Sequence, residues 1–381
     1  MSKKKEIFYK VLITTLIAIT LSKFLVLIPL DFGFFLSNKS REINQFDVYT
    51  DMIKRSDDIA YDDKVVVISL PNKAGREELT LALNMLAECE PAAIAMDIYL
   101  KEKTDTETDS LLIEAIKRSK NLILPCFTDK DKDTMQYLVK PGEYGTHCGF
   151  VNLHNDDNNE IIRSFVPMHI SSNDTMRSLA LEAVRLVYPE KIAKLDARKK
   201  SHDYINYMHY LSCYNYAEIP YFTDKLKGKI VILGKETSED IHYTPIDSKL
   251  SGHKIHAYTA STVITEDYIE QAPTWFTTII TFAILTLFAY LQVMYAMKYG
   301  RFAGFLVRSS TYIFFFAFLT TGFILFYEYS MYIDSVWLLL GVAFCPWSLD
   351  LYYIMEALCK KTKAKIVNKI SNYNNDINRF N

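Results

Sequence analysis

Long apolar segments are the feature that most restricts the folds open to this chain. Residues 7–30 are apolar over nearly their whole length. Three more such segments lie near the C-terminus, at residues 274–296, 305–327 and 332–355. A helix needs about 20 apolar residues to cross the roughly 30 Å hydrocarbon core of a bilayer. The sequence therefore predicts an α-helical membrane region of four spans, the last one shortened by Pro346.

Basic residues near the spans predict their orientation, because short cytoplasmic flanks are enriched in Lys and Arg. Such residues precede the first span, separate the second from the third and follow the fourth, at Lys3, Lys4, Lys5, Lys10, Lys298, Arg301, Lys360, Lys361, Lys363 and Lys365. No small-residue cleavage site follows the first span, which favours a retained signal anchor over residues 1–30. We expect a multi-pass protein of the inner (plasma) membrane, with residues 31–272 in the periplasm or outside the cell. Residues 273–356 then form three transmembrane helices, and residues 357–381 form a short basic cytoplasmic tail.

The formal net charge of -2 gives no electrostatic reason to expect a nucleic-acid partner. None of the six cysteines forms a CxxC or Cys/His pattern with zinc spacing, so the sequence predicts no metal site. Buried free thiols are favoured at the external cysteines. An oxidising compartment would also permit a disulfide such as Cys126 to Cys148.

The region between the first two spans alternates short β-rich runs with amphipathic helical ones. Strands are predicted at residues 65–70, 92–98, 121–127 and 229–234, and helices at residues 77–90, 109–119, 175–188 and from about 251. This alternation is typical of a mainly parallel sheet flanked by helices, with right-handed crossovers. We therefore predict an extracytoplasmic α/β domain joined to the helical membrane region.

The segment KGKIVILGKETSEDIHYTPID at residues 227–247 resembles the start of a phosphate-binding loop. The spacing excludes that interpretation, because five residues separate Gly228 from Gly234 and they form the strand itself. A phosphate loop needs four residues between the first glycine and the Gly-Lys pair. The segment is better interpreted as a buried strand that ends in a turn at Gly234.

Several motifs occur in series: VVVISL, Arg76 opening a helix, AIAMDIYL with Asp97, and GFVNLHNDDNNEIIRSFVPM. The segment LKGKIVILGKETSEDIHYTPIDSKLSGHKIHAYTASTVI completes this series. The series resembles the type-two CHASE domain, a cyclase- and histidine-kinase-associated sensory extracellular family. The resemblance marks as family landmarks Gly234, Thr244, Pro245, Gly252 and His256. It also implies a sensory role, although the 25 or so residues after the last span are too few for the catalytic output module that members often carry.

Candidate ligand-binding residues follow from strand topology, because ligands bind at the carboxyl ends of parallel strands. Asp97 ends one predicted strand, and Asp240 and Thr244 follow the strand that ends at Gly234. Arg76 and Arg163 could neutralise these carboxylates or hold a ligand anion. Each of these residues also has a structural alternative to ligand binding. The Asp97 carboxylate, for example, could accept hydrogen bonds from the backbone amides of the next turn.

His253 and His256 share one face of the predicted helix, but two ligands do not make a metal site. His256 is the sixth candidate for ligand binding, and a hydrogen-bonded structural role at the helix start is the favoured alternative. No nucleophile-elbow or zincin motif is present, so we predict neither an enzyme nor a cofactor.

The leading functional hypothesis is a non-catalytic transmembrane sensor or adaptor. Its outer domain would bind an unknown small ligand or an envelope partner, and its spans would report that state to a separate cytoplasmic protein. The main alternative is a structural subunit of an envelope or membrane protein assembly. A transport component and an external hydrolase using Asp97 and His256 are further alternatives, and the sequence is compatible with a homo-oligomer.

Overall fold

A computed structural model gives the structure of this chain. It describes residues 3–27, 44–56, 59–100, 106–126, 139, 142–154, 160–170, 175–247, 249–299 and 303–380. The chain divides into two compact units. The helical unit comprises Met1–Leu36 and Gln271–Asn381, and the α/β unit comprises Ser37–Glu270.

The α/β unit is built on a six-stranded sheet in the order β4-β3-β2-β10-β1-β9. These strands are β1 (Tyr61–Leu70), β2 (Ala93–Asp97), β3 (Leu122–Cys126), β4 (His147–Phe150), β9 (Tyr210–Asn215) and β10 (Ile230–Lys235). Every neighbouring pair is parallel, which confirms the predicted mainly parallel sheet.

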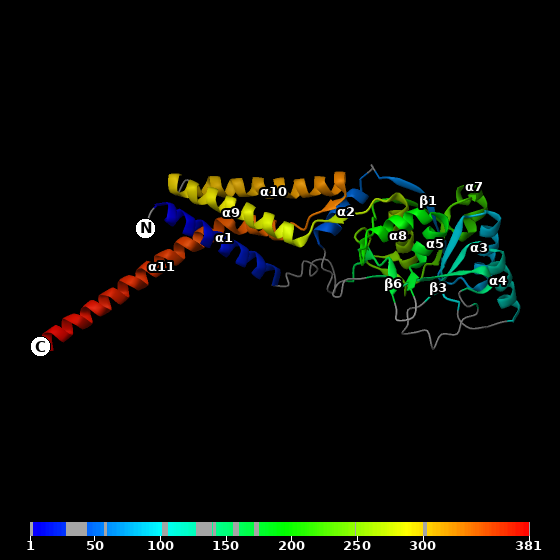
Figure 1. Cartoon of the computed structure of the whole chain (residues 1–381), viewed down its shortest axis with the longest axis horizontal. Coiled ribbons are helices and arrows are strands. Elements are labelled where there is room, and N and C mark those ends of the chain that lie inside the picture. The colour runs from blue at the N-terminus through cyan, green and yellow to red at the C-terminus, as the bar shows by residue number, and fades with distance from the viewer. Residues whose placement is uncertain are drawn as a thin grey trace. The chain divides into compact units, whose positions relative to one another are not determined.

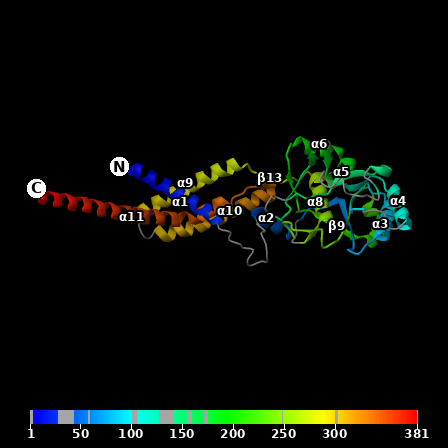
Figure 2. The same cartoon turned by 90° about the horizontal axis from the view of Figure 1, so that it is seen from below.

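Helices cover both faces of this sheet (Figures 1 and 2). One face packs against α3 (Arg76–Glu88) and α4 (Thr106–Arg118), and the other against α5 (Leu179–Val187), α6 (Pro189–Ala197) and α8 (Gly252–Thr265). Side chains alternate between the faces along each strand. In β1, Val65 and Val67 join the cluster with α5 and α8, whereas Val66 and Ile68 join the cluster with α3 and α4.

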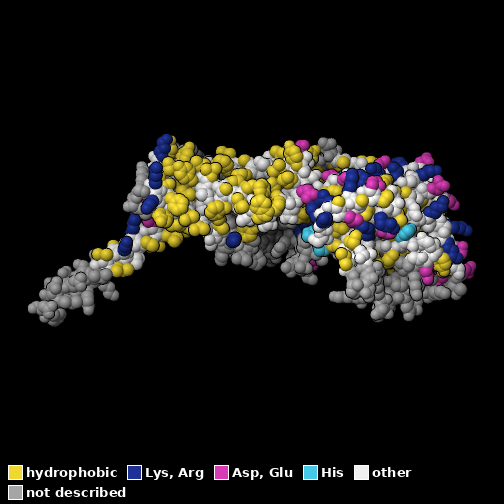
Figure 3. Space-filling view, in the orientation of Figure 1, with side chains coloured by type: hydrophobic (Ala, Val, Ile, Leu, Met, Phe, Trp, Pro, Cys, Tyr) yellow, Lys and Arg dark blue, Asp and Glu magenta, His cyan; other side chains and the backbone are white. Residues whose placement is uncertain are grey.

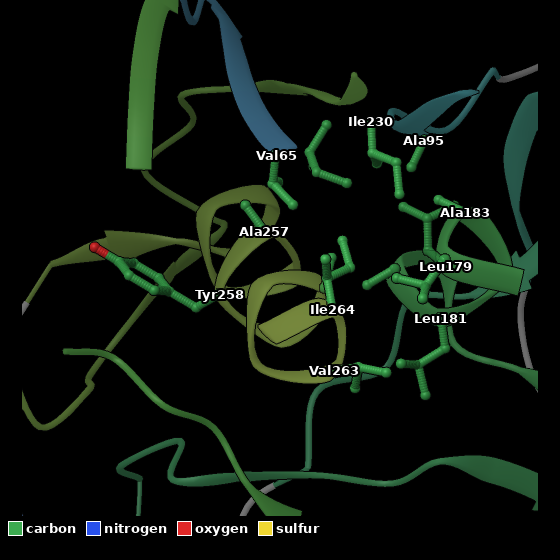
Figure 4. Close-up of a cluster of buried hydrophobic side chains, with 14 of the residues drawn as sticks. Val65, Ala95, Leu179, Leu181, Ala183, Ile230, Ala257, Tyr258, Val263 and Ile264 are labelled. Atoms are coloured by element: carbon green, nitrogen blue, oxygen red, sulfur yellow. The ribbon is translucent and has the colours of Figure 1, made fainter. Parts of the chain in front are cut away.

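The core on the α5 and α8 side is shown in Figure 4. Val65, Ala95 and Ile230 extend from the strands toward the helices. Leu179 from α5 and Ile264 from α8 meet them there. All five side chains are fully buried. This packing fixes α8 against the central strands, and the candidate site lies at the N-terminal end of that helix.

Shorter elements complete the α/β unit. They are α2 (Gln45–Lys54), η2 (Glu143–Gly145), β5 (Ser164–Phe165), β6 (Met168–Ile170), β7 (Thr175–Arg177), β8 (Asp203–Tyr204), η3 (Tyr216–Tyr221), α7 (Thr223–Leu226), β11 (Ile241–His242) and β12 (Leu250–Ser251). Strand β13 (Glu270–Gln271) spans the boundary between the two units along the chain. The helix expected over 175–188 is shorter than predicted, because residues 175–177 pair with β6 as a strand. Ser178 then caps α5 by accepting a hydrogen bond from the Leu181 amide.

A disulfide joins Cys126 at the end of β3 to Cys148 on β4, with the Cα atoms 5.9 Å apart. The sequence favoured free thiols and left this bond open. Parallel pairing of β3 with β4 places the two cysteines close together, since Leu124 is the register partner of Cys148. The bond therefore depends on a strand pairing that residue spacing alone does not reveal.

The helical unit contains α1 (Lys3–Leu27), α9 (Thr274–Tyr299), α10 (Ala303–Tyr329), β14 (Met331–Tyr332) and α11 (Val336–Phe380). Hydrophobic side chains dominate the surface of α9 and α10 in Figure 3, whereas charged side chains are frequent on the α/β unit. Within the described residues, three helices are long and apolar enough to cross a membrane: Thr274–Tyr299, Ser309–Tyr329 and Val336–Val367.

The prediction of four spans is therefore wrong by this criterion, since three candidates are found and all lie in the C-terminal region. The first predicted segment does form a helix, but the described side chains of α1 include the charged residues Glu6, Lys10 and Lys23. Residues 28–30 of that segment lie outside the described residues. Nevertheless, α1 packs against α9 and α11, with Val11 in their shared apolar cluster.

Candidate functional site

The candidate site begins where β2 and β10 end side by side. Asp97, the last residue of β2, is the register partner of Gly234 on β10. Strand β10 lies in the middle of the sheet, between β2 and β1. The predicted proximity of the Asp97 strand and the Gly234 strand is confirmed. Polar groups after either strand consequently gather at one edge of the sheet.

Glycine at position 234 allows α8 to approach the sheet closely. A Cβ atom at this position would lie 2.2 Å from the Cβ atom of His253, on the first turn of α8. His253 is completely buried, and its Nε2 lies 3.0 Å from the hydroxyl of Ser69 on β1. Burial lowers the pKa of His253 to about 4, so this imidazole is neutral at pH 7.

Asp240 holds the N-terminal end of α8. Its Oδ2 accepts a hydrogen bond from the Gly252 amide over 3.1 Å, and its Oδ1 lies 3.0 Å from Nε2 of His242. A carboxylate is stabilised at a helix N-terminus by the unpaired amides and the helix dipole. Position 252 must remain small, because a Cβ atom there would lie 2.6 Å from Oδ1 of Asp240.

These groups line a cavity of about 320 Å³ in the α/β unit. The lining residues are Asp97, Val151, Asn152, Leu153, Ile162, Asp240, His242, Gly252 and His256. They come from the end of β2, the segment after β4, the segment after β10 and the first two turns of α8. Small-molecule sites typically have volumes of about 300 to 1,000 Å³, so this cavity is large enough for a small metabolite.

Two titratable groups face each other inside the cavity. Nε2 of His256 lies 3.9 Å from Oδ2 of Asp97, and the two side chains are 4% and 15% exposed. Burial, reinforced by the charge of Asp240, raises the pKa of Asp97 to about 7. Burial also lowers the pKa of His256 to about 4, despite a hydrogen bond from its ring to the Val151 backbone. A ligand or proton therefore changes the charge of Asp97 more readily than that of His256.

The structure brings together three of the six predicted site residues, Asp97, Asp240 and His256. Arg76 forms an ion pair with the buried carboxylate of Asp109 on α4. Arg163 forms a buried two-point ion pair with Asp47 of α2, with N–O distances of 2.7 and 2.6 Å. Neither arginine lines the cavity.

Thr244 closes a turn rather than lining the cavity. Its amide and hydroxyl both donate to the Asp247 carbonyl, over 2.8 and 3.0 Å. Pro245 lies within this turn. The predicted family landmarks thus divide between the cavity and the framework around it.

Sequence reasoning missed Asn152 and His242 as cavity residues. Asn152 lies in the motif GFVNLHNDDNNEIIRSFVPM, and His242 lies between two candidate site residues, Asp240 and Thr244. In the described residues, no group of three or more His, Cys, Asp or Glu side chains is placed to hold a metal ion.

One comparison with known proteins decides the family. The model of the CHASE2 domain matches residues 46–293, which is well over half of the chain. The chain belongs to the CHASE2 domain family. CHASE2 is an extracellular sensory domain family, and no output-domain family matches the chain. The predicted resemblance is thereby confirmed.

No curated protein and no solved structure matches this CHASE2 chain. The match starts within α2 and ends within α9, so it includes the whole six-stranded sheet and all residues that line the cavity.

Proposed function

We propose that this CHASE2 protein is a non-catalytic transmembrane sensor or adaptor. In this proposal it is a multi-pass protein of the plasma membrane, with the CHASE2 domain outside and the C-terminal part of α11 in the cytoplasm. Its outer domain binds a small ligand in the Asp97 cavity and reports occupancy to a separate protein. The observation that carries the proposal is the cavity itself, which collects two carboxylates, two imidazoles and an apolar wall at the carboxyl ends of the central strands.

Helix α8 connects the cavity to the membrane helices along the chain. Gly252 and His256 on its first two turns line the cavity, and α9 begins at Thr274, shortly after α8 ends at Thr265. A ligand that tightens the groups around Asp240 also acts on the first turn of α8, since the Gly252 amide donates to that carboxylate. A change at the cavity can therefore reach α9 through one rigid helix and a short connection.

A relay also requires two arrangements of the membrane helices that differ in free energy by only a few kcal/mol. Gln292 on α9 supports this requirement. Its side chain is buried, and neither its amide oxygen nor its amide nitrogen has a hydrogen-bond partner in the described residues. An unsatisfied buried amide costs about 1 to 3 kcal/mol, so a second packing that satisfies Gln292 would be close in free energy.

Ligand-dependent stabilisation of the purified full-length protein tests this proposal. Small-molecule fractions of a cell extract are added in detergent, and thermal unfolding is followed. A ligand at 100 times its Kd stabilises the folded state by about 2.7 kcal/mol. We expect one fraction to raise the Tm of the wild type but not that of Asn152→Trp, whose larger side chain fills the cavity. The control variant Ser201→Trp adds the same side chain outside the cavity and should respond like the wild type.

The same fraction should change the amount of cytoplasmic protein that co-purifies with the wild type. If no fraction distinguishes Asn152→Trp from the wild type, the sensor proposal is wrong. Ligand-independent co-purification of envelope proteins alone would instead support the assembly-subunit alternative.

A further inference from the structure

The charges that line the Asp97 cavity are of one sign. The nine described residues that line it include two carboxylates, Asp97 and Asp240, and none of the nine is Lys or Arg. The two arginines predicted as candidates for this site form ion pairs with other carboxylates. Arg76 pairs with Asp109, and Arg163 pairs with Asp47. Like-charged carboxylates in a partly dry cavity repel an anion and attract a cation.

The two carboxylates differ in how far their hydrogen-bonding capacity is used. Asp240 is bonded to the Gly252 amide and lies against His242. Asp97 faces His256, whose Nε2 lies 3.9 Å from its Oδ2, beyond hydrogen-bond distance. His256 is itself only 4% exposed. A buried carboxylate and a buried imidazole therefore face the cavity without satisfying each other.

The rest of the lining restricts the kind of cation. Val151, Leu153 and Ile162 form an apolar wall, and a volume of about 320 Å³ is near the lower limit for small-molecule sites. No described group of three acidic, His or Cys side chains is placed to chelate a metal ion. The lining thus fits a compact molecule with one positively charged end and one apolar end.

We propose that the Asp97 cavity binds a small organic ammonium ion, with the ammonium group against Asp97 and the apolar part against Val151, Leu153 and Ile162. This inference rests on the proposed sensor function and specifies the class of its ligand. An ammonium group can donate hydrogen bonds to the Asp97 carboxylate, and its charge offsets the repulsion between Asp97 and Asp240.

Binding of a cation should be linked to pH through Asp97. Burial and Asp240 raise the pKa of this carboxyl group to about 7, and the groups that face it are Asp240, His242 and His256. A cation binds the ionised form, so its affinity is full above pH 7 and falls by about tenfold for each unit below that pH. Asp97→Asn removes this dependence together with the charge.

Matched probes test the ligand class in the full-length protein in detergent. One set is 3-methylbutylamine, 3-methylbutan-1-ol and 3-methylbutanoate, and the second is 2-phenylethylamine, 2-phenylethanol and phenylacetate. Each set keeps the apolar part nearly constant and changes the charge. We expect an amine to raise the Tm of the wild type and of the exposed-charge control Asp224→Asn, and to have no effect on Asp97→Asn.

The ammonium inference is wrong if an alcohol or a carboxylate stabilises the protein as well as its matched amine does. It is also wrong if the amine effect persists in Asp97→Asn, or if neither amine acts. These failures are distinguishable from failure of the sensor proposal. An extract fraction that stabilises the wild type but not Asn152→Trp, while both amines fail, would retain the sensor and discard the ammonium ligand.

Discussion

Gly234 and His253 are in direct contact, with the backbone of β10 against the first turn of α8. A Cβ atom on Gly234 would lie 2.2 Å from both Cβ and Cγ of His253. The Cβ atom of His253 is fixed to the helix backbone, so rotation of the imidazole cannot remove the clash. Close packing of α8 on the sheet therefore requires a residue without a side chain at position 234.

We expect Gly234→Ala to destabilise the α/β unit by about 3 kcal/mol, the upper part of the range for overpacked cores. For a domain of this size, 1 kcal/mol corresponds to a Tm change of roughly 2 to 4 °C. Gly75→Ala is the matched control, because its Cβ would make an ordinary 3.4 Å contact with Glu78. Thermal unfolding of the purified protein gives both values, and equal Tm values for the two variants would contradict the close-packing account.

The ion pair between Arg163 and Asp47 should contribute to stability rather than to ligand binding. Both side chains are at least 95% buried, so Arg163→Met leaves an unpaired carboxylate inside the protein. Such a loss typically costs about 3 to 5 kcal/mol. Arg55→Met makes the same substitution in an exposed pair with Asp51 and should cost less than about 1 kcal/mol.

Denaturant unfolding of Arg163→Met and Arg55→Met measures this difference. If Arg163→Met unfolds like the wild type but no longer responds to the stabilising extract fraction, Arg163 belongs to the binding site after all.

The comparison of sequence with structure shows which features depend on local pattern. The alternation of short β-rich runs with amphipathic helical runs was sufficient to predict β1, β2, β3 and β10 and their parallel pairing. The edge strand β9 was missed, because YLSCYN alternates buried and partly exposed residues beside several tyrosines and lacks a continuous apolar run. Helix α6 was missed because its first turn, PEK, contains two charged residues and few apolar ones.

The candidate site was predicted only in part for a related reason. Asp97 and Asp240 follow strands whose carboxyl ends meet at one edge, so topology alone was sufficient to place them together. The partners of Arg76 and Arg163 lie on α4 and α2. Those contacts depend on how helices pack on the sheet, and the order of strands along the sequence does not determine helix packing.

Asp97→Asn should stabilise the protein more at pH 8 than at pH 5. The pKa of Asp97 is raised to about 7 in the folded state, from its ordinary value of 3.8. Between pH 3.8 and about 7, Asp97 is therefore protonated in the folded state and ionised in the unfolded state. The free energy of unfolding decreases as the pH rises through this range. The raised pKa costs on the order of 4 kcal/mol of stability at pH 8 and on the order of 2 kcal/mol at pH 5, because one pKa unit corresponds to about 1.4 kcal/mol.

Thermal unfolding of the wild type and Asp97→Asn at both pH values measures this effect. His253 and His256 have the opposite dependence, since burial lowers the pKa of each and stability is lost as pH falls from about 6.5 toward 4. The comparison is made between variants at each pH, so the histidine contribution cancels. An equal Tm difference at pH 8 and pH 5 would show that Asp97 does not titrate in this window.

The disulfide between Cys126 and Cys148 should stabilise the α/β unit through the 22-residue loop that it closes. Cross-links of loops this long typically contribute about 3 kcal/mol. Dithiothreitol should lower the Tm of the wild type, and the double variant Cys126→Ser/Cys148→Ser should have the lower Tm without reductant. Cys213→Ser is the control, since Cys213 is a free and exposed cysteine. A wild-type Tm that does not respond to reductant would indicate free thiols in the native protein.

Membrane orientation is the last prediction, and it rests on the distribution of Lys and Arg around the spans. Single cysteines at Lys227 and Lys363 report the two sides, because Lys227 is 69% exposed in the α/β unit and Lys363 is exposed on α11. The exposed native cysteines Cys213 and Cys359 are replaced by serine, so the disulfide is retained. A membrane-impermeant maleimide applied to intact cells should label Lys227→Cys and spare Lys363→Cys until the membrane is permeabilised. The reverse pattern would place the CHASE2 domain in the cytoplasm, and a ligand of the Asp97 cavity would then come from inside the cell.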